Sequence, residues 1–382
     1  MARALKTLHL KGYRAFSDFR LTDLGRVNLI VGKNNAGKTS VLEAIRLLAS
    51  GGDLATLYQI AIERGESMAL DFETSEYRRR TAADISHFFH GHQFGRGSIF
   101  EIGSGNGLGT LTAAGGDIAN ASEEASLTFA ADPALFEQQI FDAGLALQLR
   151  YTGTNIKRTP TTVAVSDEGG LIFDSAMARR ISASRPTGHT ASIPTIHITP
   201  SSLETSFMAG MWERMIREGR EADAIAALKI LQPNIEGIFF LPGERALRSQ
   251  GGVLVGLKDT KQRVPLGSMG EGMRRVLALA ISLAQARKGF LLVDEFDTGL
   301  HWSVMARMWE LTMRSAAELD VQVFATTHSL DCLRGLKDAV ENNSKLAASV
   351  RVHKVDTALR HAVTFTAKDL AVAIEQEIEV RG

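Results

Sequence analysis

The sequence predicts an α/β fold with a mainly parallel core sheet, an antiparallel β subdomain and a helical arm. Three short apolar runs predict buried strands, because each has the length of a strand and is bounded by glycine or polar residues. They are Val27–Val31, Phe290–Val293 and Val321–Ala325. Helical patterns at Lys38–Ala49 and Ser303–Glu318 follow the first two runs. Apolar strands that alternate with helices are typical of a parallel sheet.

The antiparallel subdomain is predicted from strand patterns near the start and in the middle of the chain. We expect strands in Leu5–Leu10 and Tyr13–Leu21, ahead of the first core strand, and in Leu145–Tyr151. The stretch Gly103–Ser126 is rich in Gly, Ala, Ser and Thr, which predicts loops between short strands.

Two hairpins are also expected. The first would join Thr162–Val165 to Leu171–Asp174 through the turn sequence Asp167–Gly170. The second would pair Val253–Leu257 with Arg263–Leu266.

A change in composition marks the helical arm. Ser202–Ile230 is rich in Met, Glu, Arg and Ala, which favour helix, and Pro233 ends the run. The expected division is residues 1–51 and 236–382 for the core, 52–200 for an inserted mixed, β-rich subdomain and 201–235 for the arm, within one head spanning 1–382.

Composition bounds the class of protein. With 45% hydrophobic residues over 382 positions, the chain can bury a proper core. Its 43 basic residues balance 43 acidic ones, so no whole-chain positive field indicates nucleic-acid binding. Cys332 is the single cysteine, and the start of the chain lacks the apolar core of a signal peptide. The longest apolar run, Val276–Ala284, is shorter than a bilayer span, so we expect a soluble cytoplasmic protein that does not enter the membrane.

A glycine-rich motif, GxxxxGK[ST], follows the first core strand and opens a predicted helix. Its backbone amides and the positive end of the helix dipole would surround phosphates. Lys38 would reach the outer phosphates and take part in catalysis, and Thr39 would offer its hydroxyl to Mg²⁺. The motif therefore predicts binding of ATP or GTP. The expected binding residues are Gly32, Lys33, Asn34, Asn35, Ala36, Gly37, Lys38, Thr39 and Ser40.

Two carboxylates and a histidine follow the late core strands. Asp294 and Glu295 come directly after a buried strand, at the edge where open α/β sheets bind ligands. Asp294 would hold Mg²⁺ through its water shell, and Glu295 would orient and deprotonate the attacking water. His328 follows the next strand, where it could hydrogen-bond a γ-phosphate. The alternatives are a solvated acidic pair and a solvated loop histidine.

The segment Ser268–Glu271 opens a further helix. It matches a capping box, in which Ser268 and Glu271 would satisfy each other's free amides. Capping does not explain Gly270 and Gly272, because glycine in a first helical turn costs up to about 1 kcal/mol relative to alanine. Close approach of another backbone or of a phosphate would explain them.

Taken in order, these motifs resemble those of ABC-type ATPases. Within that class the chain is similar to the branch of RecF, the structural-maintenance-of-chromosomes (SMC) heads and, most closely, the overcoming-lysogenization-defect (OLD) family. The resemblance covers both ends of the chain and implies an ABC-type P-loop NTPase head that uses ATP and Mg²⁺. The motifs are Gly32–Thr39, Leu266–Glu271, Leu291–Glu295, Asp297–His301 and Ala325–His328.

The resemblance also implies a head-to-tail homodimer with two ATP molecules between the copies. Ser268 and Gly270 would belong to a signature motif that contacts the γ-phosphate held by the second copy. Asp297 would lie in the loop that crosses the interface, and His328 would be the switch histidine. A glycine-bearing helix N-terminus is an anion site whichever copy supplies the anion. A higher oligomer is compatible with this arrangement.

The partners are expected from the same resemblance. Roughly fifty residues follow His328, which is too few for the Toprim nuclease domain of full OLD proteins. We therefore expect a separate effector such as a Toprim-type nuclease, with DNA as a further partner and anti-phage defence as the setting. The alternatives are a nucleotide-binding subunit of a membrane transporter, a RecF-like DNA repair ATPase and a scaffold that binds ATP without hydrolysing it.

Two features of the family pattern stay open. Gln59 and Gln93 are both candidates for the glutamine of the Q-loop, without a confirming pattern around either. Tyr13–Phe16 resembles the N-terminal aromatic and arginine element of RecF-like heads, although short aromatic strands are commonly core.

Two polar clusters have functional and ordinary interpretations. His87, His90 and His92 suggest a metal site, but no matching acidic or cysteine cluster accompanies them, and ordinary loop histidines are the alternative. Arg78–Arg80 suggests a contact with a phosphate backbone, and a solvated face is the alternative.

Overall fold

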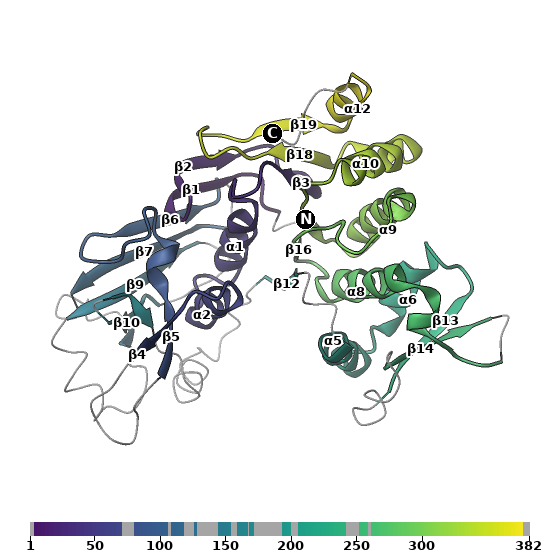
Figure 1. Cartoon of the computed structure of the whole chain (residues 1–382), viewed down its shortest axis with the longest axis horizontal. Coiled ribbons are helices and arrows are strands. Elements are labelled where there is room, and N and C mark those ends of the chain that lie inside the picture. Colours follow the sequence, from purple (N-terminus) through teal and green to yellow (C-terminus); the bar gives the residue numbers. More distant parts are fainter. Residues whose placement is uncertain are drawn as a thin grey trace.

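Helices α1 (Lys38–Ala49) and α2 (Leu54–Glu63) separate two large sheets in the computed structural model (Figure 1). The core sheet carries a row of helices on its other face. This arrangement confirms the predicted α/β class. The residues that the structure describes are 4–70, 80–105, 108–117, 126–127, 144–153, 159–166, 168–171, 193–199, 205–241, 252–258 and 261–376.

The core sheet has six strands in the order β12–β16–β17–β3–β18–β19. Neighbouring strands are parallel, except that β18 and β19 are antiparallel. β3 and β16 have the predicted bounds, and β17 is displaced by one residue. β3, from the start of the chain, lies between β17 and β18, from its end. The strands are β12 (Thr195–Ile198), β16 (Phe290–Val293), β17 (Gln322–Thr326), β3 (Val27–Val31), β18 (Val350–Lys354) and β19 (Val363–Thr366).

The second large sheet has seven strands in the order β2–β1–β6–β7–β9–β10–β8. All neighbours are antiparallel except β10 and β8. The predicted antiparallel strands near the start and middle of the chain therefore belong to one sheet. Its strands are β2 (Phe16–Leu21), β1 (Leu8–Tyr13), β6 (Ile99–Gly103), β7 (Thr110–Asp117), β9 (Leu145–Thr152), β10 (Thr161–Ala164) and β8 (Ser126–Leu127).

The loop predicted for Gly103–Ser126 is wrong where β7 runs through it. In β7, Leu111, Ala113 and Gly115 face the buried side in alternation. Only Leu111 among them has a large apolar side chain, so the strand periodicity is hard to detect in the sequence. Pairing with β6 and β9 on both edges supplies the strand's stability instead.

The predicted hairpin around Asp167–Gly170 is also wrong. The Ser166 amide donates to the Gly170 carbonyl at 3.0 Å, but the flanking strands enter different sheets. β10 already has β9 and β8 on its two edges, so β11 (Gly170–Leu171) pairs instead with β5 (Arg80–Asp84), which pairs with β4 (Ser67–Leu70). Residues 167 and 172–174 of the predicted hairpin lie outside the described residues.

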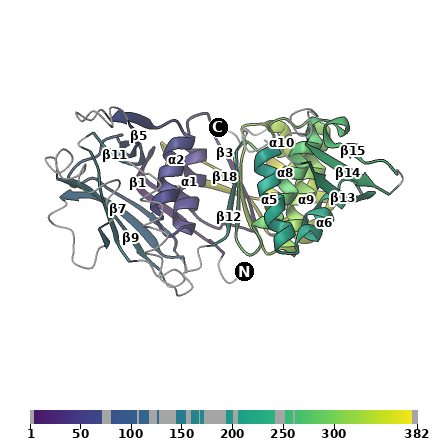
Figure 2. The same ribbon diagram turned by 90° about the horizontal axis from the view of Figure 1, so that it is seen from below.

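The second predicted hairpin is confirmed. β14 (Val253–Leu257) pairs antiparallel with β15 (Val264–Pro265) and, on its other edge, with β13 (Ile235–Phe240). These three strands form a small sheet beside the helical layer (Figure 2).

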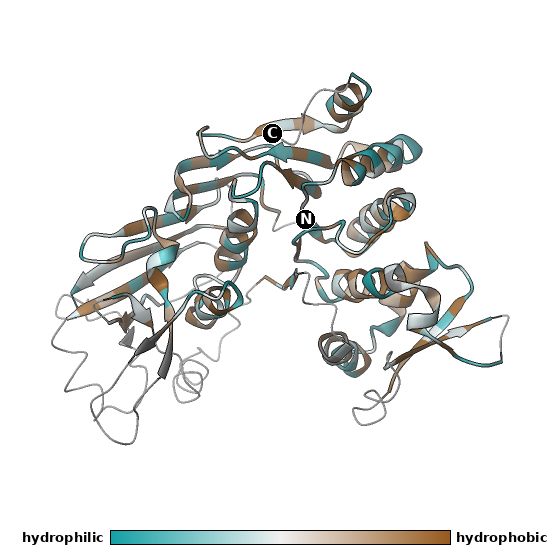
Figure 3. Cartoon of the chain, viewed as in Figure 1, coloured by the Kyte–Doolittle hydropathy of each residue, from teal (hydrophilic) through white to brown (hydrophobic). Residues whose placement is uncertain are grey.

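The two faces of the core sheet pack against different helices. Phe290 and Leu292 of β16 face α1 and the antiparallel sheet, whereas Leu291 and Val293 face the helices on the other side. α10 has hydrophilic and hydrophobic residues along its length (Figure 3), and its buried residues carry no charge. The helices on this side are α8 (Glu271–Gln285), α9 (Met305–Glu318) and α10 (Leu330–Asn342), followed by α11 (Ser344–Ala347) and α12 (Ala367–Glu375).

No helix in the described part of the chain has the length and apolarity that crossing a bilayer requires.

The segment predicted as a helical arm forms α5 (Thr205–Arg217) and α6 (Glu221–Lys229). Both lie against α8 rather than projecting from the molecule (Figure 2). The Gln285 side chain of α8 donates to the Met211 carbonyl at 3.0 Å, and Arg220 donates to the Ala284 carbonyl. These bonds, together with shared apolar packing, fix the two helices as an outer layer.

The sheets do not follow the boundaries expected from composition. β1 and β2 lie within residues 1–51, yet they pair with the antiparallel sheet of residues 52–200. β12 lies within residues 52–200, yet it forms an edge of the core sheet through its pairing with β16. The reason is that backbone pairing between distant strands leaves no trace in local composition.

His353 is fully buried on β18 and is neutral at physiological pH. Its Nε2 faces the Asn28 side-chain oxygen at 3.3 Å, and its Nδ1 faces the Thr364 hydroxyl at 3.0 Å. The Asn28 oxygen is an acceptor, so Nε2 carries the proton and Nδ1 accepts from Thr364. Burial lowers the pKa of His353 from 6.5 to about 4; the smaller effect of Asp23 raises the pKa, and that of Arg351 lowers it further.

We expect stability to fall as the pH drops from about 6.5 to about 4. In this window the unfolded histidine binds a proton and the folded one does not, which costs up to about 3 kcal/mol below the window. In His353→Asn this part of the decrease should disappear in urea unfolding at several pH values. The exposed His361→Asn variant is the control for removal of a histidine. Parallel curves for the wild type and His353→Asn would contradict the assignment.

Candidate active site

Three neighbouring strands bring the two halves of the predicted site to one edge of the core sheet. β16, β17 and β3 lie side by side, with Val293 opposite Ala325 and Thr326 opposite Ile30. Because these strands are parallel, their carboxyl ends meet at the same edge, where open α/β sheets bind ligands. The phosphate-loop motif and the acidic pair are therefore neighbours in space.

The loop after β3 presents free backbone amides. Asn35 and Gly37 have left-handed φ values of 61° and 87°. A side chain at Gly37 would meet the Phe16 ring, which lies 2.5 Å from the position of a Cβ atom. Gly37 is the N-cap of α1, and no side chain among the described residues caps it, so the first amides can bind phosphate. In this loop Gly32, Ala36 and Ser40 are buried, Gly37, Lys38 and Thr39 are half-buried, and Lys33, Asn34 and Asn35 are exposed.

The Lys38 ammonium folds back over its own loop. Its Nζ donates to the carbonyls of Gly32 and Lys33, both at 2.8 Å. Burial lowers the pKa of Lys38, while the nearby negative charges of Asp294 and Glu295 oppose that shift. The positive charge of Lys38 therefore lies close to the acidic pair.

Thr39 and Asp294 meet across the two halves of the site. The Thr39 hydroxyl donates to the two Asp294 carboxylate oxygens at 3.0 and 3.3 Å. A hydroxyl and a carboxylate beside a phosphate site are the hard oxygen donors that Mg²⁺ prefers. The residues present thus fit a magnesium ion bound together with a nucleoside triphosphate.

Glu295 sits in a strained turn directly after Asp294. Its φ is 50°, a left-handed conformation that is unusual for a residue with a side chain. The Glu295 amide donates to the Thr326 hydroxyl at 2.9 Å, and the Thr298 hydroxyl donates to the Glu295 carboxylate at 2.9 Å. Its backbone and its carboxylate are thus fixed separately.

Thr326 is a site residue that sequence reasoning did not assign. Its hydroxyl donates to Asp294 at 2.5 Å while accepting from the Glu295 amide. One side chain therefore orients both acidic residues. The sequence offered one signal for Thr326: it is a polar residue at the end of an apolar strand. The strand that precedes it in the sequence ends in the acidic pair.

The capping box predicted for Ser268 and Glu271 is wrong. Leu266–Met269 forms a 3₁₀ turn, and α8 begins after Gly270, which is its N-cap and has a φ of 95°. No side chain of the described residues caps this helix. The left-handed conformation explains Gly270 directly. It also turns the preceding segment away, so Ser268 is exposed rather than folded onto the helix.

The start of α8 is open. No atom of the described residues lies within 4 Å of the position that a Cβ of Gly270 would occupy, and beside Gly272 the nearest is a Leu300 side-chain carbon at 3.6 Å. The close backbone approach considered for these glycines is therefore not made within the described part of the chain.

Asp297 and His328 lie on adjoining loops. The Thr327 hydroxyl donates to the Asp297 carboxylate at 2.5 Å and accepts from the Ser329 amide at 2.9 Å. This links the loop after β16 to the loop after β17. His328 is exposed between Thr327 and the start of α10.

The glutamine candidates lie on separate elements. Gln59 is on α2, where its side chain accepts a hydrogen bond from Arg46 at 3.2 Å. Gln93 is exposed in the loop before β6.

The histidine cluster forms ordinary hydrogen bonds. His87 and His92 lie 3.2 Å apart through their Nδ1 atoms, and His90 bonds the Arg14 carbonyl at 2.8 Å. Among the described residues, no group of three or more His, Cys, Asp or Glu side chains could hold a metal ion. The first two residues of the Arg78–Arg80 cluster lie outside the described residues.

Arg14 holds the phosphate-loop helix α1 on the side of the antiparallel sheet. It is 4% exposed and forms an ion pair with Glu43 of α1 at 2.8 Å. It also donates to the Glu66 carboxylate at 2.7 and 3.1 Å. Arg64 donates to the other Glu43 oxygen at 2.5 Å and to the Ser40 hydroxyl at 3.2 Å. The Tyr13–Phe16 element thus does more than fill the core.

Two protein-family models match the chain at its two ends. Residues 4–86 match "AAA ATPase domain", and residues 244–333 match "AAA domain, putative AbiEii toxin, Type IV TA system". The first match contains the phosphate loop, and the second contains the acidic pair. The chain thus matches AAA-type ATPase models in both halves of the assembled site.

Individual relatives differ in how much of this chain they match. An "ATP/GTP phosphatase" of Helicobacter pylori is 21% identical over 359 residues, covering 88% of both chains. The "Methionine import ATP-binding protein MetN 1" of Listeria monocytogenes is 29% identical over 129 residues, 33% of this chain and 38% of the relative. The "DNA double-strand break repair Rad50 ATPase" of Archaeoglobus fulgidus is 40% identical over 72 residues, 18% of this chain and 8% of the relative.

The chain therefore spans well under half the length of several relatives that it matches. Among solved structures, an SMC head bound to the C-terminal winged-helix domain of ScpA has a TM-score of 0.47 and 12% identity, covering 96% of this chain and 99% of the other.

We expect Glu43→Ala to lower the free energy of unfolding by about 3 kcal/mol, because it leaves the buried charge of Arg14 without one of its partners. Urea unfolding at neutral pH measures the change. Glu101→Ala is the matched control, since its ion pair with Lys11 is exposed and should contribute less than about 1 kcal/mol. Equal effects of the two substitutions would show that the buried cluster has no special role.

Proposed function

We propose that this ATPase closes as a homodimer around ATP and acts as a switch for a separate effector. The observation that carries the proposal is the open start of α8, where Ser268 is exposed and no side chain of the described residues caps the first helical amides. Such a helix start binds anions. In the proposed dimer the anion is the γ-phosphate of the ATP held by the second copy.

In this proposal each copy supplies a complete hydrolytic set. Lys38 and the amides at the start of α1 bind the phosphates, while Thr39 and Asp294 hold the magnesium ion. Bound Mg²⁺ supplies charge neutralisation on the phosphates. Glu295 orients the attacking water and takes its proton, and His328 contacts the γ-phosphate. Positioning and electrostatics carry phosphoryl transfer, which suits a site built from fixed side chains.

The effector and setting are proposed from resemblance. The motif order is similar to that of OLD proteins, and one family model matched by the chain is described as a putative toxin of a toxin–antitoxin system. The Rad50 and RecF relatives have names that refer to DNA repair and replication. We therefore propose a cytoplasmic ATPase that acts with a partner such as a Toprim-type nuclease and with DNA, in anti-phage defence.

Glu295→Gln tests the proposal directly. Loss of the proton acceptor should lower kcat by about 10²–10⁴-fold while ATP binding is kept. The variant should therefore retain ATP and accumulate as a dimer in size-exclusion chromatography coupled to light scattering.

Ser268→Arg is the matched control, because it alters only the exposed signature segment. It should bind ATP as a monomer, and combining it with Glu295→Gln should abolish the ATP-dependent dimer. The two-copy model is wrong if Glu295→Gln neither retains ATP nor dimerises more than the wild type.

A transporter subunit is the second candidate, because the match to MetN covers a third of the chain. About two hundred residues separate the phosphate loop from the signature, and this long interval argues against it. Native purification distinguishes the two: co-purification of an integral membrane protein supports the transporter, and co-purification of a nuclease with DNA supports the switch.

A further inference from the structure

Arg275 is a buried arginine on the second turn of α8. Its side chain is 4% exposed, and its Nη2 atom donates to the Glu295 backbone carbonyl. Its other terminal nitrogen, Nη1, is buried and has no hydrogen-bond partner within the described residues. Burial lowers the pKa of Arg275, while the charges of Asp297 and Glu295 oppose that shift. A buried guanidinium with an unpartnered N–H is costly, so packing alone is a poor reason for its presence.

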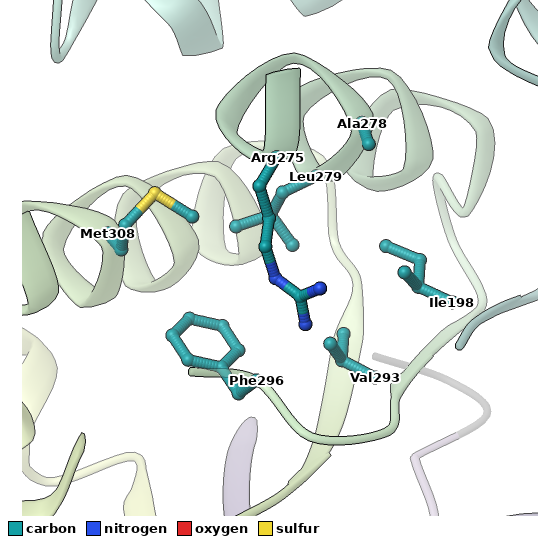
Figure 4. A pocket seen from close by; sticks show the side chains of 7 residues that line it. All are labelled: Ile198, Arg275, Ala278, Leu279, Val293, Phe296 and Met308. Atoms are coloured by element: carbon teal, nitrogen blue, oxygen red, sulfur yellow. The ribbon is translucent and has the colours of Figure 1, made fainter. Parts of the chain in front are cut away.

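The side chains that line the cavity beside the guanidinium are apolar. Arg275 lines a cavity of about 10 Å³, which is close to the minimum for a single water molecule. Figure 4 shows the guanidinium between the Phe296 ring and the Val293 side chain. A water molecule here would find few polar partners besides Arg275 itself. The other residues that line the cavity are Ile198, Ala278, Leu279, Val293, Phe296 and Met308.

The one group that Arg275 binds is the backbone of a strained residue. A left-handed φ of 50° costs a residue such as Glu295 about 1–2 kcal/mol, and it persists only when the surroundings fix it. The Glu295 carbonyl accepts from both Arg275 and the Thr298 amide, the latter at 3.1 Å. The Glu295 amide is bound by Thr326. Of the three residues that bond the Glu295 backbone, Arg275, Thr298 and Thr326, only Arg275 lies on α8.

We propose that Arg275 is a positioning residue for ATP hydrolysis, which fixes the turn at Glu295 and so aims its carboxylate. It stands five residues after Gly270, the N-cap of the same helix, so a shift of the signature end of α8 would reach Glu295 through one buried side chain. The proposed effect of Arg275 on Glu295 rests only on the role of Glu295 in hydrolysis. The link to the signature rests on the proposed two-copy function.

Steady-state kinetics of Arg275→Met and Arg275→Lys test this role. Methionine keeps much of the side-chain volume and removes the donor, so kcat should fall by up to about 10²-fold while KM and the Kd for ATP stay within about twofold. Lysine keeps one donor and should recover a large part of kcat. Arg287→Met is the matched control, because Arg287 lies beyond the other end of α8 and pairs with Asp223 at 3.2 Å.

A double-mutant cycle shows whether Arg275 acts through Glu295. If it does, adding Arg275→Met to Glu295→Gln should not lower the residual single-turnover rate further. Additive losses would overturn the proposal, as would a wild-type kcat in Arg275→Met or an equal loss of ATP affinity. If Arg275→Met fails to fold, Arg275→Gln and Arg275→Lys provide the same cycle.

The link to the signature has its own readout. Ser268→Arg should abolish the dependence of kcat on protein concentration, and Arg275→Met should weaken that dependence while ATP-driven dimerisation in the Glu295→Gln background persists. Loss of dimerisation in Glu295→Gln alone would reject the two-copy function and leave the result of the Arg275–Glu295 cycle unaffected. Full concentration dependence in Arg275→Met would reject the link itself.

Discussion

The pairing of β3 with β17 on one edge and β18 on the other is the constraint on which the site depends. It joins the start of the chain to its end through backbone hydrogen bonds, and the parallel direction places the carboxyl ends of β3, β16 and β17 together. Neither half of the site has its partner until this pairing exists. Closing such a long loop costs only slightly more entropy than closing a short one, but long-range parallel pairing forms slowly. Assembly of the site therefore requires that the core sheet has formed.

The antiparallel sheet also helps to hold the phosphate loop in place. Its first two strands place Phe16 behind Gly37 and Arg14 against Glu43, so the loop and its helix are fixed from the side opposite the core sheet. α1 is packed between two sheets and cannot move without disturbing one of them. A buried charge cluster stabilises little in net terms but makes any rearrangement costly. The loop is thereby preorganised for phosphate.

The sequence predicted what depends on local pattern. β3, α1 and β16 were predicted with their observed bounds, because each is a continuous apolar run or a helical stripe with clear ends. β7 and the partner of β11 were missed, since distant backbone pairing decides them. The capping box failed because Gly270 changes the chain direction between its two members. Arg275 and Thr326 could not be assigned, because their roles come from contacts with residues on other elements.

Several side chains of the site are hydrogen-bonded to one another or to the loop in the folded chain. Lys38 bonds two carbonyls of its loop, and Thr39 bonds Asp294, which also accepts from Thr326. A bound nucleotide would engage Lys38, and its metal ion would engage Thr39 and Asp294, so binding would exchange side-chain bonds that are already formed at the site. The exchange does not involve the backbone bonds of Glu295, which come from Thr326, Thr298 and Arg275. Lys38 and Thr39 thus serve binding, Arg275 and Thr298 fix the turn at Glu295, and Thr326 takes part in both sets of contacts. In the proposed dimer, the start of α8 would act on the turn at Glu295 through Arg275 of the same copy.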